Sequence, residues 1–119
     1  MLNIARTPLG RIITGWLFTY MSFALPVKRL RETKNLLAFY NPQPSYPVHV
    51  LIVPKKAVAS LTELDTTDQD FLIDLFQCVQ DLVRELGLEE TGYRLIVNGG
   101  QYQDVAQLHF HLISGQPRK

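Results

Sequence analysis

Two of the three histidines in this chain, His109 and His111, stand one residue apart in the segment QLHFHLI, residues 107–113. A β-strand points successive side chains to opposite faces, so Gln107, His109 and His111 share one face while apolar residues occupy the other. Imidazole acts as a base, a nucleophile or a metal ligand near neutral pH. The turn at residues 98–101, NGGQ, leads amide groups towards the same face. We therefore predict that this face carries the functional site.

Three kinds of chemistry fit two imidazoles on one strand face. Together with His49 they could bind zinc or iron, although no carboxylate follows between Leu112 and Lys119. The face could instead bind a ligand through hydrogen bonds without catalysing a reaction. In the third interpretation one neutral imidazole attacks phosphorus, which requires a backbone acceptor that fixes its tautomer and nearby donors for phosphate oxygens. The spacing alone leaves all three open.

The composition is that of a single globular domain. The chain has 119 residues, which is enough for one hydrophobic core, and a net charge of +1 gives no electrostatic argument for nucleic acid as the main partner. The basic cluster Lys28, Arg29, Arg31 and Lys34 is interpreted as solvated surface, with phosphate or anionic lipid as the alternative partner. A single cysteine, Cys78, provides no disulfide framework and no cysteine zinc site, which favours a reducing, cytoplasmic location.

An apolar segment lies near the N-terminus, where residues 12–27 carry no charge and follow Arg6 and Arg11. The segment lacks the cleavage site of a signal peptide, with Pro26 where that site should be, and it is short for a membrane span. Its apolar residues recur every four positions, which predicts a buried or dimer-packed amphipathic helix that ends at Pro26. Contact of this helix with a membrane surface is the less favoured alternative.

The rest of the chain predicts four strands and one long helix. Apolar runs predict strands at residues 36–40, 48–53, 93–97 and 107–113. Three prolines predict an ordered loop at residues 41–47. The long helix is expected from about Thr67 to Leu86, with a threonine cap at its start and Gly87 at its end. The resulting order, α-β-β-α-β-β, lacks the βαβ alternation of a doubly wound parallel sheet.

Residues 107–113 resemble the signature of the histidine triad (HIT) superfamily, His-φ-His-φ-His-φ-φ with φ apolar, with Gln107 in place of the first histidine. The resemblance to the Hint branch continues in order and spacing through residues 37–41, 47–56, 86–88 and 92–98. It implies an α+β fold, an antiparallel sheet of about five strands with two main helices, usually in a homodimer whose sheets run together. We expect one domain over residues 1–119, in which an N-terminal helix and a basic connector (1–35) precede the HIT core (36–115).

The resemblance also implies a purine-nucleotide pocket and a role for each histidine. His109 falls on the histidine that attacks the α-phosphorus, giving a nucleotidyl-histidine that water or another acceptor then resolves. His111 falls on the histidine that contacts the phosphate and helps the leaving group. The main-chain carbonyl of Gln107 would orient the His109 ring. His49, which alone on an apolar strand is more often a core residue, matches the family's fourth, supporting histidine. No metal and no cofactor are implied.

Several positions depart from the family pattern. The expected nucleotide-binding residues are Phe39, Asn41, Leu51, Asn98, Gln103 and Asp104. Gln107 replaces an ionisable group with one that only forms hydrogen bonds. Asn41 stands where an aspartate holds the ribose hydroxyls, and the turn after Asn98 is about two residues shorter than in Hint. Asp104 stands where a serine assists the scissile bridge, and a carboxylate there repels a phosphoryl group unless it is protonated or turned away.

These residues together predict a nucleotide-binding hydrolase or nucleotidyl transferase. It would act on the α-phosphate of purine nucleotide conjugates of the phosphoramidate or dinucleoside polyphosphate type. The alternative is a non-catalytic or weakly active nucleotide-binding protein, which Gln107 and Asp104 favour. The expected partners are a purine nucleotide or its conjugate and a second copy of the chain.

Overall fold

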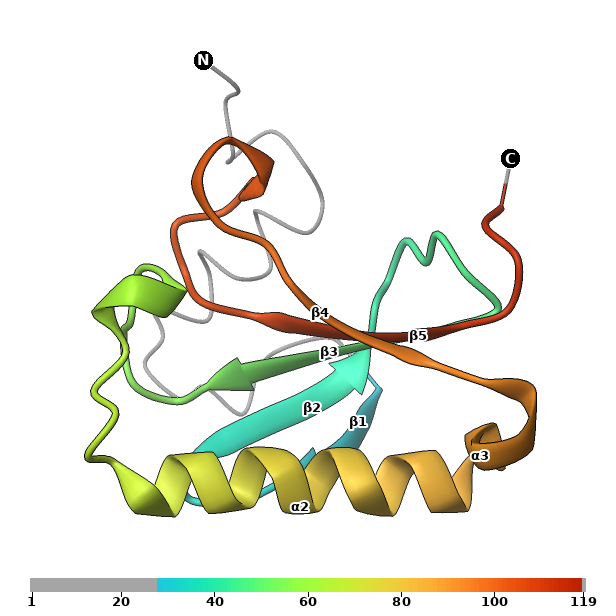
Figure 1. The fold of residues 1–119 in the computed structure, drawn as a ribbon, viewed down its shortest axis with the longest axis horizontal. Coiled ribbons are helices and arrows are strands. Elements are labelled where there is room, and N and C mark those ends of the chain that lie inside the picture. The colour runs from blue at the N-terminus through green and yellow to red at the C-terminus, as the bar shows by residue number, and fades with distance from the viewer. Residues whose placement is uncertain (1–27, 119) are drawn as a thin grey trace.

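The five strands of the protein form one antiparallel sheet with a long helix packed on one face, as the computed structural model of residues 28–118 shows (Figure 1). The elements are β1 (Arg29–Glu32), β2 (Leu36–Tyr40), β3 (Val48–Pro54), η2 (Leu61–Glu63), α2 (Gln69–Glu85), α3 (Leu88–Thr91), β4 (Arg94–Val97), η3 (Gly100–Tyr102) and β5 (Phe110–Ser114). The strand order is β1-β2-β3-β5-β4. The predicted α+β fold is confirmed.

The helix predicted within residues 12–27 lies outside the described residues. Within residues 28–118, no helix is both long enough and apolar enough to cross a membrane.

β1 lies where the sequence predicts only a basic connector, so that part of the prediction is wrong. The strand pairs antiparallel with β2, and its register shifts between Arg29 and Arg31. Leu30 packs against the core, while Arg29 pairs with Glu32 and Arg31 contacts Glu85 of α2. A four-residue edge strand with one apolar side chain leaves no alternation to detect, and its charges keep the open edge in water.

α2 begins later than the threonine cap predicts. The side chain of Asp68 caps it by accepting a hydrogen bond from the N–H of Phe71 at 3.2 Å. Thr67 instead donates to Asp65 from both its N–H and its hydroxyl. The helix ends as predicted before Gly87, whose φ of 68° is a left-handed conformation that glycine adopts without strain.

The two faces of the sheet carry different kinds of residue. The face under α2 forms the hydrophobic core, with Leu36, Ala38, Val50, Ile52, Phe110 and Leu112 from the strands and Phe71, Leu75, Cys78, Val79, Leu82 and Val83 from the helix. On the opposite face, the strand register places Phe39, Leu51, His111 and Ile96 in one row across β2, β3, β5 and β4. His49 lies on that second face because it is two residues from Leu51 on β3.

Candidate active site

The segment that carries the histidine pair is tied to the chain that follows β3. β5 begins at Phe110, so Gln107 to His109 precede the strand, whereas the sequence predicts them within it. The N–H of Leu108 donates to the carbonyl of Val58 at 2.7 Å, and Nε2 of Gln107 donates to the carbonyl of Lys56 at 3.2 Å. Gln107 is only 1% exposed. These bonds replace strand pairing and fix the approach to the histidines.

The ring of His109 is held by a main-chain group. Its Nδ1 lies 2.8 Å from the carbonyl oxygen of Gln107, which can only accept a hydrogen bond. The hydrogen of a neutral His109 ring therefore lies on Nδ1, and Nε2 keeps its lone pair. No described residue bonds to that Nε2 atom. His109 is buried, with 5% of its surface exposed.

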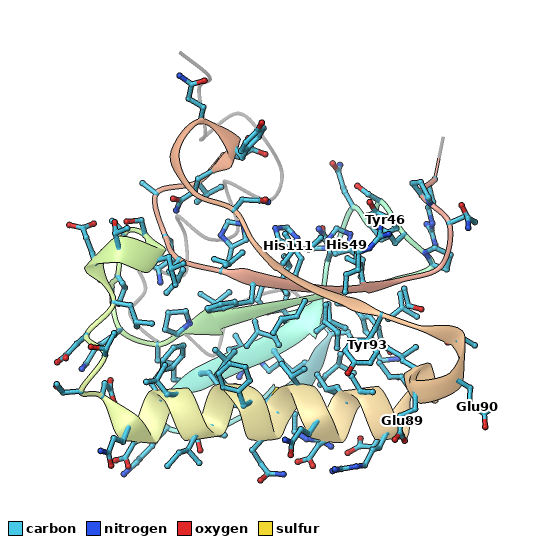
Figure 2. All side chains as sticks on the ribbon, in the orientation of Figure 1. Tyr46, His49, Glu89, Glu90, Tyr93 and His111 are labelled. Carbon is cyan, nitrogen blue, oxygen red and sulfur yellow. The ribbon has the colours of Figure 1, made fainter. Side chains whose placement is uncertain are left out.

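His49 and His111 lie side by side on the face opposite α2 (Figure 2). His49 is paired with Ile113 and His111 with Leu51, so the two histidines are diagonal neighbours on β3 and β5. Nε2 of His49 lies 2.9 Å from Nδ1 of His111. The His111 ring is also 5.0 Å from the His109 ring, measured between centroids. The fold thus brings together the three histidines that the sequence singles out.

Both members of the hydrogen-bonded pair are neutral at neutral pH. Burial, together with the nearby His109 and His49, lowers the pKa of His111 to about 4. Burial also lowers the pKa of His49. Nε2 of His49 and Nδ1 of His111 are hydrogen-bonded to each other, so these two atoms are not available as metal ligands. Within residues 28–118, no group of three or more His, Cys, Asp or Glu side chains is arranged to hold a metal ion.

The predicted nucleotide contacts on β2 and β3 lie close to the histidines. Phe39 and Leu51 are buried in the same row of the sheet as His111. Asn41 follows β2, and its Oδ1 accepts a hydrogen bond from the N–H of Gln43 at 2.9 Å. One lone pair of that oxygen is therefore used within the loop, and a second remains for a ligand.

The other three predicted nucleotide-binding residues lie in the segment between β4 and β5. Nε2 of Gln103 donates to the carbonyls of Ala59 and Val105, at 2.7 and 2.9 Å. Both of its amide hydrogens are thus used to hold the loop, which leaves none for a phosphate oxygen. Asp104 is exposed and Asn98 is half-buried directly after β4. In the described part of the chain, no hydrogen bond joins these residues to the histidines.

Sequence reasoning does not identify Ser45, whose N–H donates to Nδ1 of His49 at 3.0 Å. The contact comes from the main chain, so the residue type at position 45 does not indicate it. The available signal is the run of prolines around Ser45, which leaves few N–H groups in the loop.

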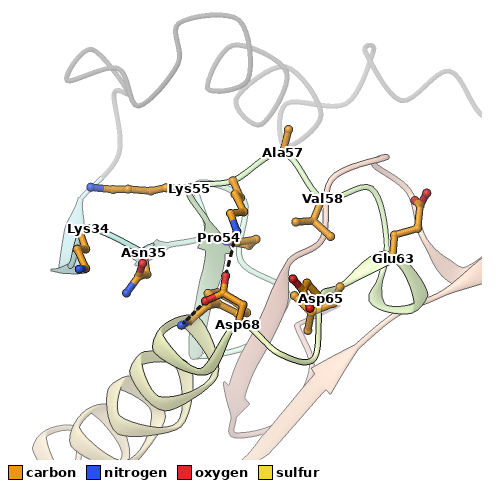
Figure 3. Close-up of a pocket in the computed structure, with 12 residues that line it drawn as sticks. Lys34, Asn35, Pro54, Lys55, Ala57, Val58, Glu63, Asp65 and Asp68 are labelled. Carbon is orange, nitrogen blue, oxygen red and sulfur yellow. Dashed lines mark hydrogen bonds and ion pairs between the residues drawn. The ribbon is translucent and has the colours of Figure 1, made fainter.

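A separate cavity of about 520 Å³ lies between the start of α2, the start of β2 and the end of β3 (Figure 3). It is lined by Lys34, Asn35, Pro54, Lys55, Lys56, Ala57, Val58, Glu63, Leu64, Asp65, Asp68 and Phe71. None of the predicted site residues is among them. Lys56 and Asp68 form an ion pair at 3.2 Å on its wall, and its charges of both signs favour no single class of ligand.

Comparison with known proteins gives a consistent result. The HIT domain model matches residues 23–118. An uncharacterized HIT-like protein of Rickettsia prowazekii is 35% identical over 95 residues, which cover 77% of this chain and 79% of the relative. A HIT family hydrolase of Legionella pneumophila is 35% identical with a TM-score of 0.71, covering 76% of this chain and 83% of that one. A histidine triad nucleotide-binding protein of Candida albicans is 33% identical with a TM-score of 0.70, covering 87% of this chain and 74% of that one. The chain belongs to the HIT domain family.

Proposed function

We propose that this protein is a nucleotide-binding hydrolase or nucleotidyl transferase that acts on the α-phosphate of purine nucleotide conjugates, of the phosphoramidate or dinucleoside polyphosphate type. The observation that carries the proposal is the bond from Nδ1 of His109 to the carbonyl of Gln107, because it leaves the Nε2 lone pair for attack. The similarity to a HIT family hydrolase and to a histidine triad nucleotide-binding protein supports it.

The proposed reaction has two steps. Nε2 of His109 attacks the α-phosphorus, the bond from phosphorus to the leaving group breaks, and the leaving group departs with the bonding electrons and takes up a proton from solvent. Water or another acceptor then attacks the same phosphorus and gives up a proton to solvent, the phosphorus–nitrogen bond breaks, and His109 regains its lone pair. His111, with its ring 5.0 Å from that of His109, is placed to contact the phosphate or the leaving group.

Gln107 is compatible with this reaction because the group that orients His109 is a main-chain carbonyl, which any residue at position 107 supplies. The Gln107 side chain donates to the carbonyl of Lys56 and so fixes the same segment without carrying a charge. We assign it a positioning role. We assign Gln103 a similar role in its loop, while Phe39, Leu51 and Asn41 are the proposed contacts of the base and the ribose.

The alternative is nucleotide binding with little or no turnover. Its specific support is the burial of His109, which would have to become accessible to a phosphoryl group, together with Gln107 and Asp104 at positions where the family pattern has other residues.

We also propose that the protein is a homodimer. β4 is an edge strand of the sheet, and its residues Leu95 to Val97 are only half-buried. On α2, Ile73 and Phe76 are 63% and 55% exposed, and they belong to an apolar surface with Leu72. An open strand edge and exposed large apolar side chains are features that a second copy would cover.

The proposed function predicts that His109→Ala abolishes turnover. With adenosine phosphoramidate as substrate, we expect the rate of AMP release to fall at least about a thousand-fold, because the nucleophile is gone. AMP binding, measured by calorimetry, should persist. Glu90→Gln is the control, since Glu90 lies on α3, far from His49 and His111 in Figure 2.

Equal turnover by the wild type and the His109→Ala variant would contradict the assignment of the nucleophile. AMP binding by the wild type without any turnover would favour the alternative function.

A further inference from the structure

The loop between β2 and β3, residues 41–47, encloses one side of the His49 ring. Three of its residues are prolines, which lack an N–H group. The N–H of Gln43 donates to the side chain of Asn41, and the N–H of Ser45 donates to Nδ1 of His49 at 3.0 Å. The ring of Tyr46 lies edge-on to the His49 ring, 5.8 Å away between centroids (Figure 2). This loop therefore gives one main-chain donor to a histidine of the site.

That donor determines where the hydrogens of two rings lie. A neutral imidazole has one N–H and one acceptor nitrogen. Because Ser45 donates to Nδ1 of His49, the His49 hydrogen lies on Nε2, which then donates to Nδ1 of His111 at 2.9 Å. Nδ1 of His111 is thereby an acceptor, so the hydrogen of His111 lies on Nε2.

The amide of Asn41 does not alter this assignment. Its Nδ2 lies 3.5 Å from Nε2 of His49, at the limit of a hydrogen bond. If Nδ2 donated there, both nitrogens of His49 would be acceptors, which a neutral imidazole does not allow.

We propose that Ser45 is a positioning residue whose main-chain N–H sets the tautomers of His49 and His111. This inference rests on the proposed function for its catalytic meaning. His109 then presents a lone pair at Nε2, while His111 presents an N–H donor at Nε2 to the phosphate or the leaving group. With the opposite tautomer of His49, His111 would turn a lone pair towards the anionic phosphate, which it would repel.

The position of the Ser45 N–H is held from two sides. The N–H of Asn41 donates to the carbonyl of His49 at 2.9 Å, which closes the loop onto β3. The N–H of Arg118 donates to the carbonyl of Ser45 at 2.7 Å. At Gly115, a Cβ would lie 2.7 Å from Cγ of Pro47, so the segment after β5 packs tightly against the loop. The donor is thus part of a fixed structure.

The test is ¹⁵N NMR of the imidazole rings in the full chain without substrate, because long-range ¹H–¹⁵N couplings distinguish the two tautomers. At pH 7, we expect His49 and His111 as Nε2–H tautomers and His109 as the Nδ1–H tautomer. An Nδ1–H tautomer at His49 in the wild type would overturn the proposal, whatever the variants do.

Two substitutions at one position separate the main chain from the side chain. Ser45→Pro removes the N–H and should give mixed tautomers at His49 and His111. Ser45→Ala keeps the N–H and should give the wild-type tautomers. Tautomers that are unchanged in a folded Ser45→Pro protein would also overturn the proposal.

Kinetics connect the tautomers to the reaction. In Ser45→Pro, we expect kcat to fall about tenfold with little change in KM, since part of the contribution of a hydrogen-bond donor to the phosphate or leaving group is lost. Wild-type tautomers as predicted without any turnover would contradict the proposed function and leave the role of Ser45 in setting the tautomers intact. An unchanged kcat in a Ser45→Pro protein with altered tautomers would overturn the catalytic part of the inference.

Discussion

Single main-chain groups control the chemistry of the histidines at the residue scale. The carbonyl of Gln107 fixes the hydrogen of His109 on Nδ1, and the N–H of Ser45 leads to a hydrogen on Nε2 of His111. The two neighbouring rings thus present different groups at Nε2, a lone pair on His109 and an N–H on His111. A substitution at position 107 keeps the carbonyl, so glutamine there is compatible with the orientation of His109 that the proposed function requires.

The low pKa of His111 predicts that the folded protein loses stability in acid. The unfolded ring titrates near 6.5, whereas burial and the neighbouring histidines lower the pKa in the folded protein to about 4. Between these values the unfolded state binds more protons, so the free energy of unfolding decreases as the pH falls through this window. A difference of about 2.5 pKa units corresponds to a loss on the order of 3 kcal/mol.

Urea unfolding between pH 7 and pH 4 measures this loss. His111→Gln should remove much of the pH dependence in this window, and the His49 ring, whose pKa is also lowered, should account for part of the remainder. The same slope in the wild type and in His111→Gln would contradict the assignment.

Elements position the site through contacts that lie outside regular strand pairing. Residues 107–109 are held by the carbonyls of Lys56 and Val58, and the loop at 41–47 is held by the segment after β5. The histidine face therefore depends on two irregular segments as well as on the sheet.

The packing of Pro47 against Gly115 predicts that Gly115→Ala destabilises the protein. The φ of Gly115 is 92°, and a Cβ would lie 2.7 Å from Cγ of Pro47. We expect the free energy of unfolding to fall by about 1–3 kcal/mol in urea titrations. Gly99→Ala is the matched control, because Gly99 has a φ of −136° and nothing within 4 Å of an added Cβ. Equal stability of the two variants would show that the loop does not pack as described.

The sequence predicts the parts of this structure that depend on repeated side-chain patterns. The apolar stripe of α2 and the alternation around His111 locate the core and the histidine face. β1 is missed because Leu30 is its one apolar residue. The start of α2 is misplaced because Asp68, rather than a threonine, provides the cap. Ser45 is missed because its contribution comes from the backbone, which every residue except proline has in common.

At the scale of the whole molecule, one face of the sheet packs against α2 in the core, and the other face carries the histidines. On α2, Ile73 and Phe76 remain exposed, and β4 is one of the two edge strands of the sheet, with β1 at the other edge. Membership of the HIT domain family agrees with this arrangement of a single sheet and a covering helix.

The proposed dimer predicts a change in mass when the α2 surface is charged. Phe76→Glu should weaken the dimer about tenfold or more, because a large apolar side chain at an interface is replaced by a charge that must lose water. Phe76→Leu keeps the surface apolar and should remain dimeric. Sedimentation equilibrium at micromolar concentrations checks both variants, and a monomeric wild type would contradict the dimer.

Mass spectrometry of the protein mixed with adenosine phosphoramidate, followed over time, tests the central proposal most directly. We predict a transient adduct with the mass of one adenylyl group, mapped to His109, while AMP accumulates. Bound nucleotide with neither an adduct nor AMP would contradict catalysis through His109 and would indicate a nucleotide-binding protein instead.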